Sequence, residues 1–140
     1  GDTVNIAARL EASAKQYGVY IQVAENTYKA VSNDFEWRFL DNVKVKGKSK
    51  PVRVFELISN KDKLDEKNEK LLSSFNQGIK NYENKKWSLA LKDFENSQKF
   101  EDMFIGRPTN PSLIYIERCK YFIDNPPNKD WDGIWTLNIK

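Results

Sequence analysis

Residues 35–58 read FEWRFLDNVKVKGKSKPVRVFELI, and their pattern predicts a β-hairpin. Apolar residues alternate with other residues in two runs that flank residues 47–51, a segment made only of glycine, lysine, serine and proline. Such alternation is typical of half-buried strands, and glycine and proline between two strands are typical of a turn. The alternating residues are Phe35, Trp37, Phe39, Val43, Val45, Val52, Val54 and Leu57. The hairpin should therefore have an apolar face and a basic tip.

The residues before the hairpin extend this pattern into a mixed α/β domain. A helix is expected over residues 3–16, with Gly18 placed to end it. Residues 19–23 alternate as a half-buried strand does, and residues 25–31 are expected to form a short helix. We therefore expect residues 1–58 to form one α+β domain.

The composition shifts sharply at residues 59–70. Apart from Leu64 this run is charged or polar, which is typical of a solvated linker or of an exposed helix start. Asp62, Asp65 and Glu66 cluster in this run, and we interpret them as solvated side chains and not as metal ligands. The domain boundary is therefore predicted here.

Residues 71–140 are expected to form an all-α tail. Apolar residues recur at helical spacing on both sides of a polar turn, which predicts a helical hairpin. The pair resembles one tetratricopeptide repeat, in which Gly78 lets the two helices approach and Ala90 and Phe94 fill the gap. A single copy of the repeat is visible. Pro111 is well placed in the first turn of a third helix.

The composition argues against several classes of function. With 23 basic and 20 acidic residues the net charge is +3, so the chain lacks the dense basic face of a nucleic-acid-binding protein. No apolar run approaches the ~20 residues of a membrane span, so we expect no membrane contact by this segment. Membrane attachment through segments upstream of Gly1 stays open.

The few reactive residue types narrow the chemistry further. There is no histidine, which excludes Ser-His and Cys-His nucleophiles and histidine-based metal sites. The single cysteine, Cys119, excludes an internal disulfide and favours a reducing, cytoplasmic location. We expect Cys119 to be packed in a core. Any catalysis must therefore rest on lysine, arginine, asparagine or carboxylates.

Two motifs resemble a known family. Residues 1–10, GDTVNIAARL, are similar to the G-x-x-V-N-x-A-[AS]-R-[LM] helix of class III adenylate and guanylate cyclases. Residues 40–48, LDNVKVKGK, resemble the V-K-V-K-G-K hairpin of the same family and follow in the family's order. Residues 1–58 thus resemble the C-terminal half of the cyclase catalytic domain. The tail, for example at residues 111–113, looks like an extension found on many bacterial cyclases.

The resemblance implies a partial ferredoxin-like cyclase domain and gives three residues a role. Arg9 would stabilise the transition state, Asn5 would orient the ribose, and Lys46 would hold the terminal phosphates of the substrate. These residue types suit the reaction, because cyclisation builds negative charge on phosphoryl oxygens and a guanidinium is always charged. Being four residues apart, Asn5 and Arg9 would project from one helix face. Without the motifs, the same residues would be interpreted as an exposed polar stripe and a solvated hairpin.

The resemblance also implies components that this chain does not supply. Family cyclases hold two metal ions, Mg²⁺ or Mn²⁺, with two aspartates on strands that would precede Gly1. They act as homodimers with shared active sites, in which one chain gives the aspartates and the other gives the helix with Asn5 and Arg9. The substrate would be ATP or GTP, with ATP favoured, and the products a cyclic nucleotide and pyrophosphate. The parent protein would thus be a phosphorus–oxygen lyase.

A second hypothesis is a non-catalytic interaction module, a cyclase remnant whose helical tail binds another protein. Since about three repeats are needed to bury a continuous core, a single repeat would pack on its own cyclase domain or on a partner. Without the front half of the domain, a strand edge and an apolar face would be left open. We expect the chain to dimerise, exchange elements or cover this face with its tail. The sequence upstream of Gly1 would distinguish the two hypotheses.

We predict that the isolated 140-residue chain has no cyclase activity, because two-metal phosphoryl chemistry needs the carboxylates that hold the ions. Incubation with ATP or GTP and Mn²⁺ should give no cyclic nucleotide above a protein-free blank, while a complete cyclase assayed in parallel gives a clear signal. Turnover by the purified chain would contradict this prediction.

Overall fold

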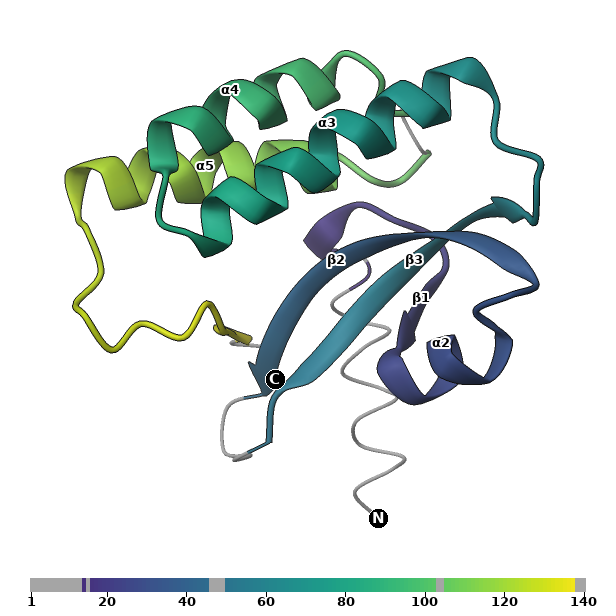
Figure 1. The fold of residues 1–140 in the computed structure, drawn as a ribbon, viewed down its shortest axis with the longest axis horizontal. Coiled ribbons are helices and arrows are strands. Elements are labelled where there is room, and N and C mark those ends of the chain that lie inside the picture. Colours follow the sequence, from purple (N-terminus) through teal and green to yellow (C-terminus); the bar gives the residue numbers. More distant parts are fainter. Residues whose placement is uncertain (1–13, 15, 46–49, 103–104, 138–140) are drawn as a thin grey trace. The chain divides into compact units, whose positions relative to one another are not determined.

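The computed structural model describes residues 14, 16–45, 50–102 and 105–137 of the chain. They form two compact units. The first holds the described residues up to Lys63 together with those from Gly133 onward, and the second holds Leu64–Asp132. Strands lie in the first unit and long helices in the second, which confirms the predicted α+β class (Figure 1).

In the described residues, the first unit is a four-stranded mixed sheet with the order β1-β3-β2-β4. β1 and β2 both pair antiparallel with β3, whereas β4 pairs parallel with β2. β2 and β3 form the hairpin that the alternation predicts, and helix α2 (Glu25–Val31) has the predicted bounds (Figure 1). The strands are β1 (Gln22–Ala24), β2 (Phe35–Val45), β3 (Val52–Asn60) and β4 (Trp135–Leu137).

Aromatic side chains join α2 to the sheet. The ring of Tyr28 in α2 stacks on Phe55 of β3 with centroids 3.8 Å apart, and it meets Trp37 of β2 edge-on at 5.4 Å. Phe39 packs edge-on against Phe55 at 5.7 Å. Aromatic residues of this kind combine large buried area with specific ring geometry. The alternating aromatic residues of the hairpin therefore form the face that α2 covers.

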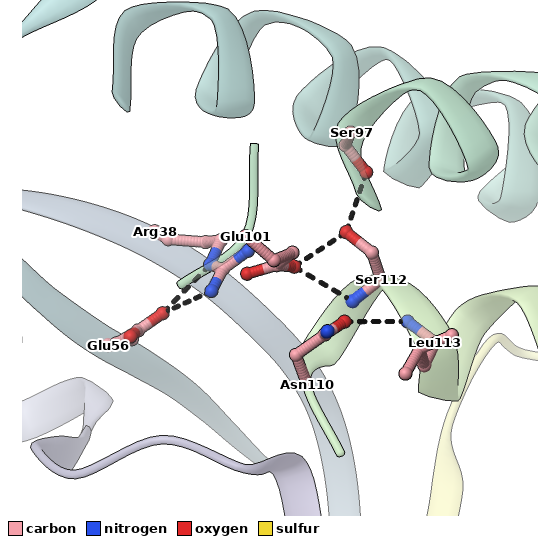
Figure 2. Close-up of polar contacts among 7 residues, drawn as sticks. All are labelled: Arg38, Glu56, Ser97, Glu101, Asn110, Ser112 and Leu113. Carbon is pink, nitrogen blue, oxygen red and sulfur yellow. Dashed lines mark hydrogen bonds and ion pairs between the residues drawn. The ribbon is translucent and has the colours of Figure 1, made fainter. Parts of the chain in front are cut away.

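A buried ion pair links the middle of the hairpin. Arg38 lies directly opposite Glu56 in the β2–β3 register. Its Nη2 and Nε lie 2.7 and 2.8 Å from Glu56 Oε1 (Figure 2). The two side chains are only 2% and 5% exposed. Charges so far from water are tolerated only when they are paired and hydrogen-bonded, and this pair meets that requirement.

The first strand is shorter than the alternation of residues 19–23 predicts. Val19 is fully buried, but its N–H donates to Ala14 O at 3.0 Å and so belongs to the end of the preceding helix. Ile21, expected in the buried set, is 52% exposed. Pairing with β3 begins only at Ile21, whose carbonyl accepts the N–H of Leu57 at 3.1 Å. Because Val19 completes the last turn of the preceding helix, β1 begins later in the sequence than the alternation predicts.

The second unit confirms the helical hairpin and the third helix. Helix α3 (Glu66–Glu83) and helix α4 (Trp87–Gln98) flank a turn in which Lys85 has a φ of 60°, and α5 (Pro111–Asp124) follows (Figure 1). Gly78 of α3 faces α4 so closely that an added Cβ would lie 2.7 Å from the ring of Phe94. Phe94 in turn stacks on Tyr115 of α5 with centroids 4.8 Å apart. The three helices therefore share one core.

Side-chain oxygens accept hydrogen bonds from backbone N–H groups in the first turn of α5. Asn110 Oδ1 accepts the N–H of Leu113 at 2.9 Å, and Glu101 Oε2 accepts the Ser112 N–H at 3.0 Å and its hydroxyl at 2.6 Å (Figure 2). The Ser97 and Ser112 hydroxyl oxygens are 2.6 Å apart, which ties α5 to the end of α4. A helix start has N–H groups without intrahelical partners, so these acceptors fix where α5 begins.

An aromatic cluster closes the other end of this unit. The ring of Trp131 lies 5.5 Å from Tyr82, 5.2 Å from Trp87 and 5.6 Å from Phe122, so the chain after α5 is held against all three helices. Cys119 is fully buried, as predicted, and this burial raises the pKa of its thiol to about 12. A thiol of this kind is a packing residue at neutral pH.

The charged run between the units is shorter than residues 59–70. Ser59 and Asn60 complete β3, because their backbones still pair with β2. At the other end α3 begins at Glu66, one residue after Asp65, whose carboxylate accepts the Asn68 N–H at 2.8 Å. Asp65 is therefore a helix cap, which its position before a long helical pattern favours.

The end of the chain differs from the predicted all-α tail over residues 71–140. Residues from Gly133 onward belong to the sheet unit, and Trp135–Leu137 form β4. Aromatic and β-branched residues such as Trp135 and Thr136 favour a strand over a helix. The helical unit is thus inserted between β3 and β4 of one sheet, and it is not a terminal extension of that sheet.

We predict that Gly78→Ala destabilises the chain although alanine is the better helix former. Helix propensity alone would stabilise α3 by about 1 kcal/mol, whereas the new methyl group would press into Phe94, whose ring is held by its neighbours. Overpacking of this kind costs about 1–3 kcal/mol, so the free energy of unfolding measured in urea should fall. Asn76→Ala, at an exposed position of the same helix, is the control and should be neutral or stabilising. A more stable Gly78→Ala variant would contradict the packing described above.

Candidate functional site

The three residues that the sequence assigns to the reaction, Asn5, Arg9 and Lys46, lie outside the described residues. The structure describes the chain that adjoins them. On one side is the helix end before Gly18, and on the other are the two strands that flank residues 46–49. The contacts described below anchor these adjoining segments.

A buried cap ends the helix that follows the Asn5 and Arg9 segment. Ala14 and Tyr17 are helical and buried, and Gly18 has a φ of 74°, as a glycine at a helix C-terminus often does. The Val19 N–H closes the last turn on the Ala14 carbonyl, which is the hydrogen bond of a Schellman cap. Gly18 thus ends the helix as predicted.

One hydrogen bond ties this helix end to β2. The Tyr17 hydroxyl donates to Asp41 Oδ2, while Asp41 Oδ1 accepts the N–H of Asn42 at 2.9 Å. Asp41 is 1% exposed and directly follows Leu40, which is buried as well. Consecutive strand residues normally point to opposite faces, and the register shift between Phe39 and Asp41 is what allows both to be buried.

This bond joins the two parts of the chain that carry the predicted residues. Tyr17 ends the helical segment after Arg9, and Asp41 lies on the strand that leads to Lys46. Neither anchoring residue, Tyr17 or Asp41, was predicted from the sequence. The signal available was the position of Asp41 in the alternation, where the residues two positions before and after it, Phe39 and Val43, are both apolar.

Positive charge gathers at the strand ends next to the hairpin turn. Lys44, Lys50 and Arg53 lie on or next to the strand ends that flank residues 46–49. The Arg53 guanidinium is already engaged, 4.9 Å from the ring centre of Phe39 and 3.7 Å from Glu25 Oε2. Lys50 is exposed. These cations can add diffuse attraction for an anion, but they do not by themselves form a binding site.

The described parts of the chain offer no ligand set for a metal ion. Among them, no three His, Cys, Asp or Glu side chains come together closely enough to hold one. No helix in the described residues is both long enough and apolar enough to cross a membrane.

The first part of the chain matches a protein family. Residues 1–59 match the model of the adenylate and guanylate cyclase catalytic domain. This match covers both motifs and extends almost to the end of β3. No solved structure matches the chain significantly.

Two curated proteins are similar to the chain. The terminal-differentiation-specific adenylate cyclase of Dictyostelium discoideum is 32% identical over 124 residues, which are 85% of this chain and 6% of that protein. An adenylate cyclase of Anabaena cylindrica is 40% identical over 60 residues, 41% of this chain and 12% of that protein. The chain thus spans only a small part of each relative. Because a match over 85% of the chain cannot fit within residues 1–59, the Dictyostelium similarity extends into the helical unit.

We predict that Tyr17→Phe lowers the free energy of unfolding by about 1.5–3 kcal/mol, because it removes one donor from a buried carboxylate while it keeps the ring. The matched control is Tyr28→Phe, which deletes the hydroxyl of a ring held by stacking and should change stability by less than about 0.5 kcal/mol. Urea unfolding of both variants decides the comparison. Equal stability of the two variants would show that the Tyr17–Asp41 bond does not anchor the helix end.

Proposed function

Residues 1–59 belong to the adenylate and guanylate cyclase catalytic-domain family, and from this premise we propose that the chain is part of an adenylate cyclase. Such an enzyme converts ATP to cyclic AMP and pyrophosphate. The observation that carries the proposal is the family match over both motifs. ATP is preferred to GTP in the proposal because both similar curated proteins bear the name adenylate cyclase.

Arg9 and Asn5 would act on the reacting part of the nucleotide. As the ribose 3′-oxygen attacks the α-phosphate, negative charge grows on the phosphoryl oxygens and on the pyrophosphate that leaves. A guanidinium stays charged and presents fixed donors, so Arg9 would stabilise this charge more in the transition state than in the bound substrate. The amide of Asn5 would hold the ribose so that its 3′-oxygen is aligned for attack.

Lys46 would bind the terminal phosphates as a compact positive charge. This contact exists before and during the reaction, so it contributes to substrate binding more than to the rate of the chemical step. The hydrogen bond between Tyr17 and Asp41 supports this proposal. It anchors the helix end that follows Arg9 in the sequence to β2, the strand that leads to Lys46. Rigid anchoring matters since positioned charges lose their effect when they can move.

The proposed enzyme needs components beyond this chain. Two Mg²⁺ or Mn²⁺ ions would supply charge neutralisation and activation of the attacking oxygen, and aspartates outside this chain would hold them. We also propose a homodimer with shared active sites, in which one chain contributes Asn5 and Arg9 and the other contributes the aspartates. The sheet unit would then be half of a ferredoxin-like cyclase domain.

For the helical unit we propose a tetratricopeptide-like role in binding a protein segment. The close approach of Gly78 to Phe94 and the buried Ala90 support this geometry. Exposed apolar side chains at Leu89 and Tyr121 would suit a protein contact. A cyclase remnant that acts only through this helical unit is the second candidate function, and the assay below separates it from the first.

We predict opposite kinetic signatures for two substitutions in an active cyclase that includes this chain. Arg9→Ala should lower kcat about 10²–10³-fold with little change in KM, because its charge is needed mainly in the transition state. Lys46→Ala should raise the KM for ATP about tenfold or more with a smaller effect on kcat, as expected for a charged contact made in ground and transition states alike.

Lys50→Ala is the matched control, since it removes an exposed lysine near the same hairpin tip and should leave both constants nearly unchanged. An Arg9→Ala variant altered only in KM would overturn the assigned roles. A complete protein that binds partners but forms no cyclic AMP would favour the non-catalytic alternative.

A further inference from the structure

The short strand β4 is attached to the part of β2 that leads to the proposed phosphate contact. It pairs parallel with the last three residues of β2, Trp135 with Val43, Thr136 with Lys44 and Leu137 with Val45. Lys46 follows directly in the sequence. The structure thus places β4 beside the end of β2 that is next to the hairpin turn (Figure 1).

Pairing with β3, the other strand of the hairpin, ends before β2 itself ends. In the described register of β2 with β3, the last pair is Val43 with Val52, two residues before β2 ends. Among the residues that the structure describes, Lys44 and Val45 therefore have their strand partners in β4. A strand end without a partner on either side exposes its backbone groups and frays readily. β4 is what makes these two residues part of the sheet.

Only a short segment of the sequence separates β4 from the helical unit. Trp131 packs into the aromatic cluster of the helical unit, and its N–H donates to the Asn128 carbonyl at 3.2 Å. Between that unit and β4 the chain has only Gly133, with a φ of 80°, and Ile134.

We propose that β4 is a positioning strand for the hairpin: by pairing with Lys44 and Val45, it orders the two residues that precede Lys46 in the sequence. This inference rests on the proposed role of Lys46 in binding phosphates. β4 would act by preorganisation, because ordering the end of β2 in advance lowers the conformational entropy that is lost when the nucleotide binds.

Two truncated versions of the chain separate the effect of β4 from that of the residues around it. One ends after Ile134 and lacks β4, whereas its matched control ends after Leu137 and keeps it. In the first, amide hydrogen exchange at the residues 43–45 that face β4 should rise about tenfold or more, since their hydrogen bonds are lost. Residues 54–56, which pair within the β1–β3–β2 part of the sheet, should stay protected and report that the sheet is folded.

A second variant covers the case in which the shortened chain fails to fold. Trp135→Gly, Thr136→Gly and Leu137→Gly combined keep the chain length but weaken the strand, because glycine disfavours extended pairing. The same local rise in exchange at residues 43–45 is expected. Unchanged exchange there, in a variant whose residues 54–56 stay protected, would overturn the proposal.

The functional arm uses an active cyclase that includes this chain. Loss of β4 should raise the KM for ATP about tenfold, the cost of ordering one or two backbone residues on binding, while kcat changes little. A merely structural role would lower the amount of active enzyme and leave KM unchanged. An unchanged KM together with faster exchange at residues 43–45 would therefore overturn the positioning role.

Lys46→Ala in the same enzyme separates this inference from the proposed function. If Lys46→Ala raises KM and loss of β4 does not, the phosphate contact stands and the positioning role of β4 fails. If Lys46→Ala leaves KM unchanged, the proposed phosphate contact fails, and with it the functional part of the inference. The exchange data then decide whether β4 orders the end of β2.

Discussion

The buried pair of Arg38 and Glu56 constrains the whole sheet unit. Both charges are removed from water and paired with each other, and removing one partner of such a pair typically costs about 3–5 kcal/mol. The pair also sets the register, because a slip of one residue would turn Arg38 toward the aromatic face that α2 covers. In this register, the Asp41 carboxylate accepts a hydrogen bond from the Tyr17 hydroxyl. The end of β2 extends past its last β3 partner and pairs with β4.

The position of the helical unit within the sequence changes how the chain is understood. The unit lies between β3 and β4, so the chain leaves the sheet, forms three helices and returns to pair parallel with β2. Parallel neighbours need a long crossover connection, and here the helices supply it. The Dictyostelium similarity runs past the cyclase motifs into the helices, so it covers part of both units.

Local patterns predicted most of the elements, because each depends on neighbouring residues. The hairpin, α2, the helical pair and α5 follow from alternation, helical spacing and capping residues. β4 could not be predicted in this way, since a three-residue strand is defined by a partner about ninety positions away. Likewise, alternation identifies the aromatic face of β2 but not the burial of Arg38 on the other face, which depends on Glu56. Asn5, Arg9 and Lys46 were found through motifs, and they lie outside the described residues.

The contacts around the motif segments explain why a cyclase of this family would build its sheet in this way. Stabilising charge that develops on phosphoryl oxygens requires donors that are already in place, because donors that must reorganise lose much of their effect. Two described elements next to the motif segments are anchored on β2, the helix end at Tyr17 through its hydrogen bond to Asp41 and the end of β2 through its pairing with β4. The buried pair of Arg38 and Glu56 joins the same strand to β3. In the proposed enzyme, this sheet would be the support from which Arg9 and Lys46 act.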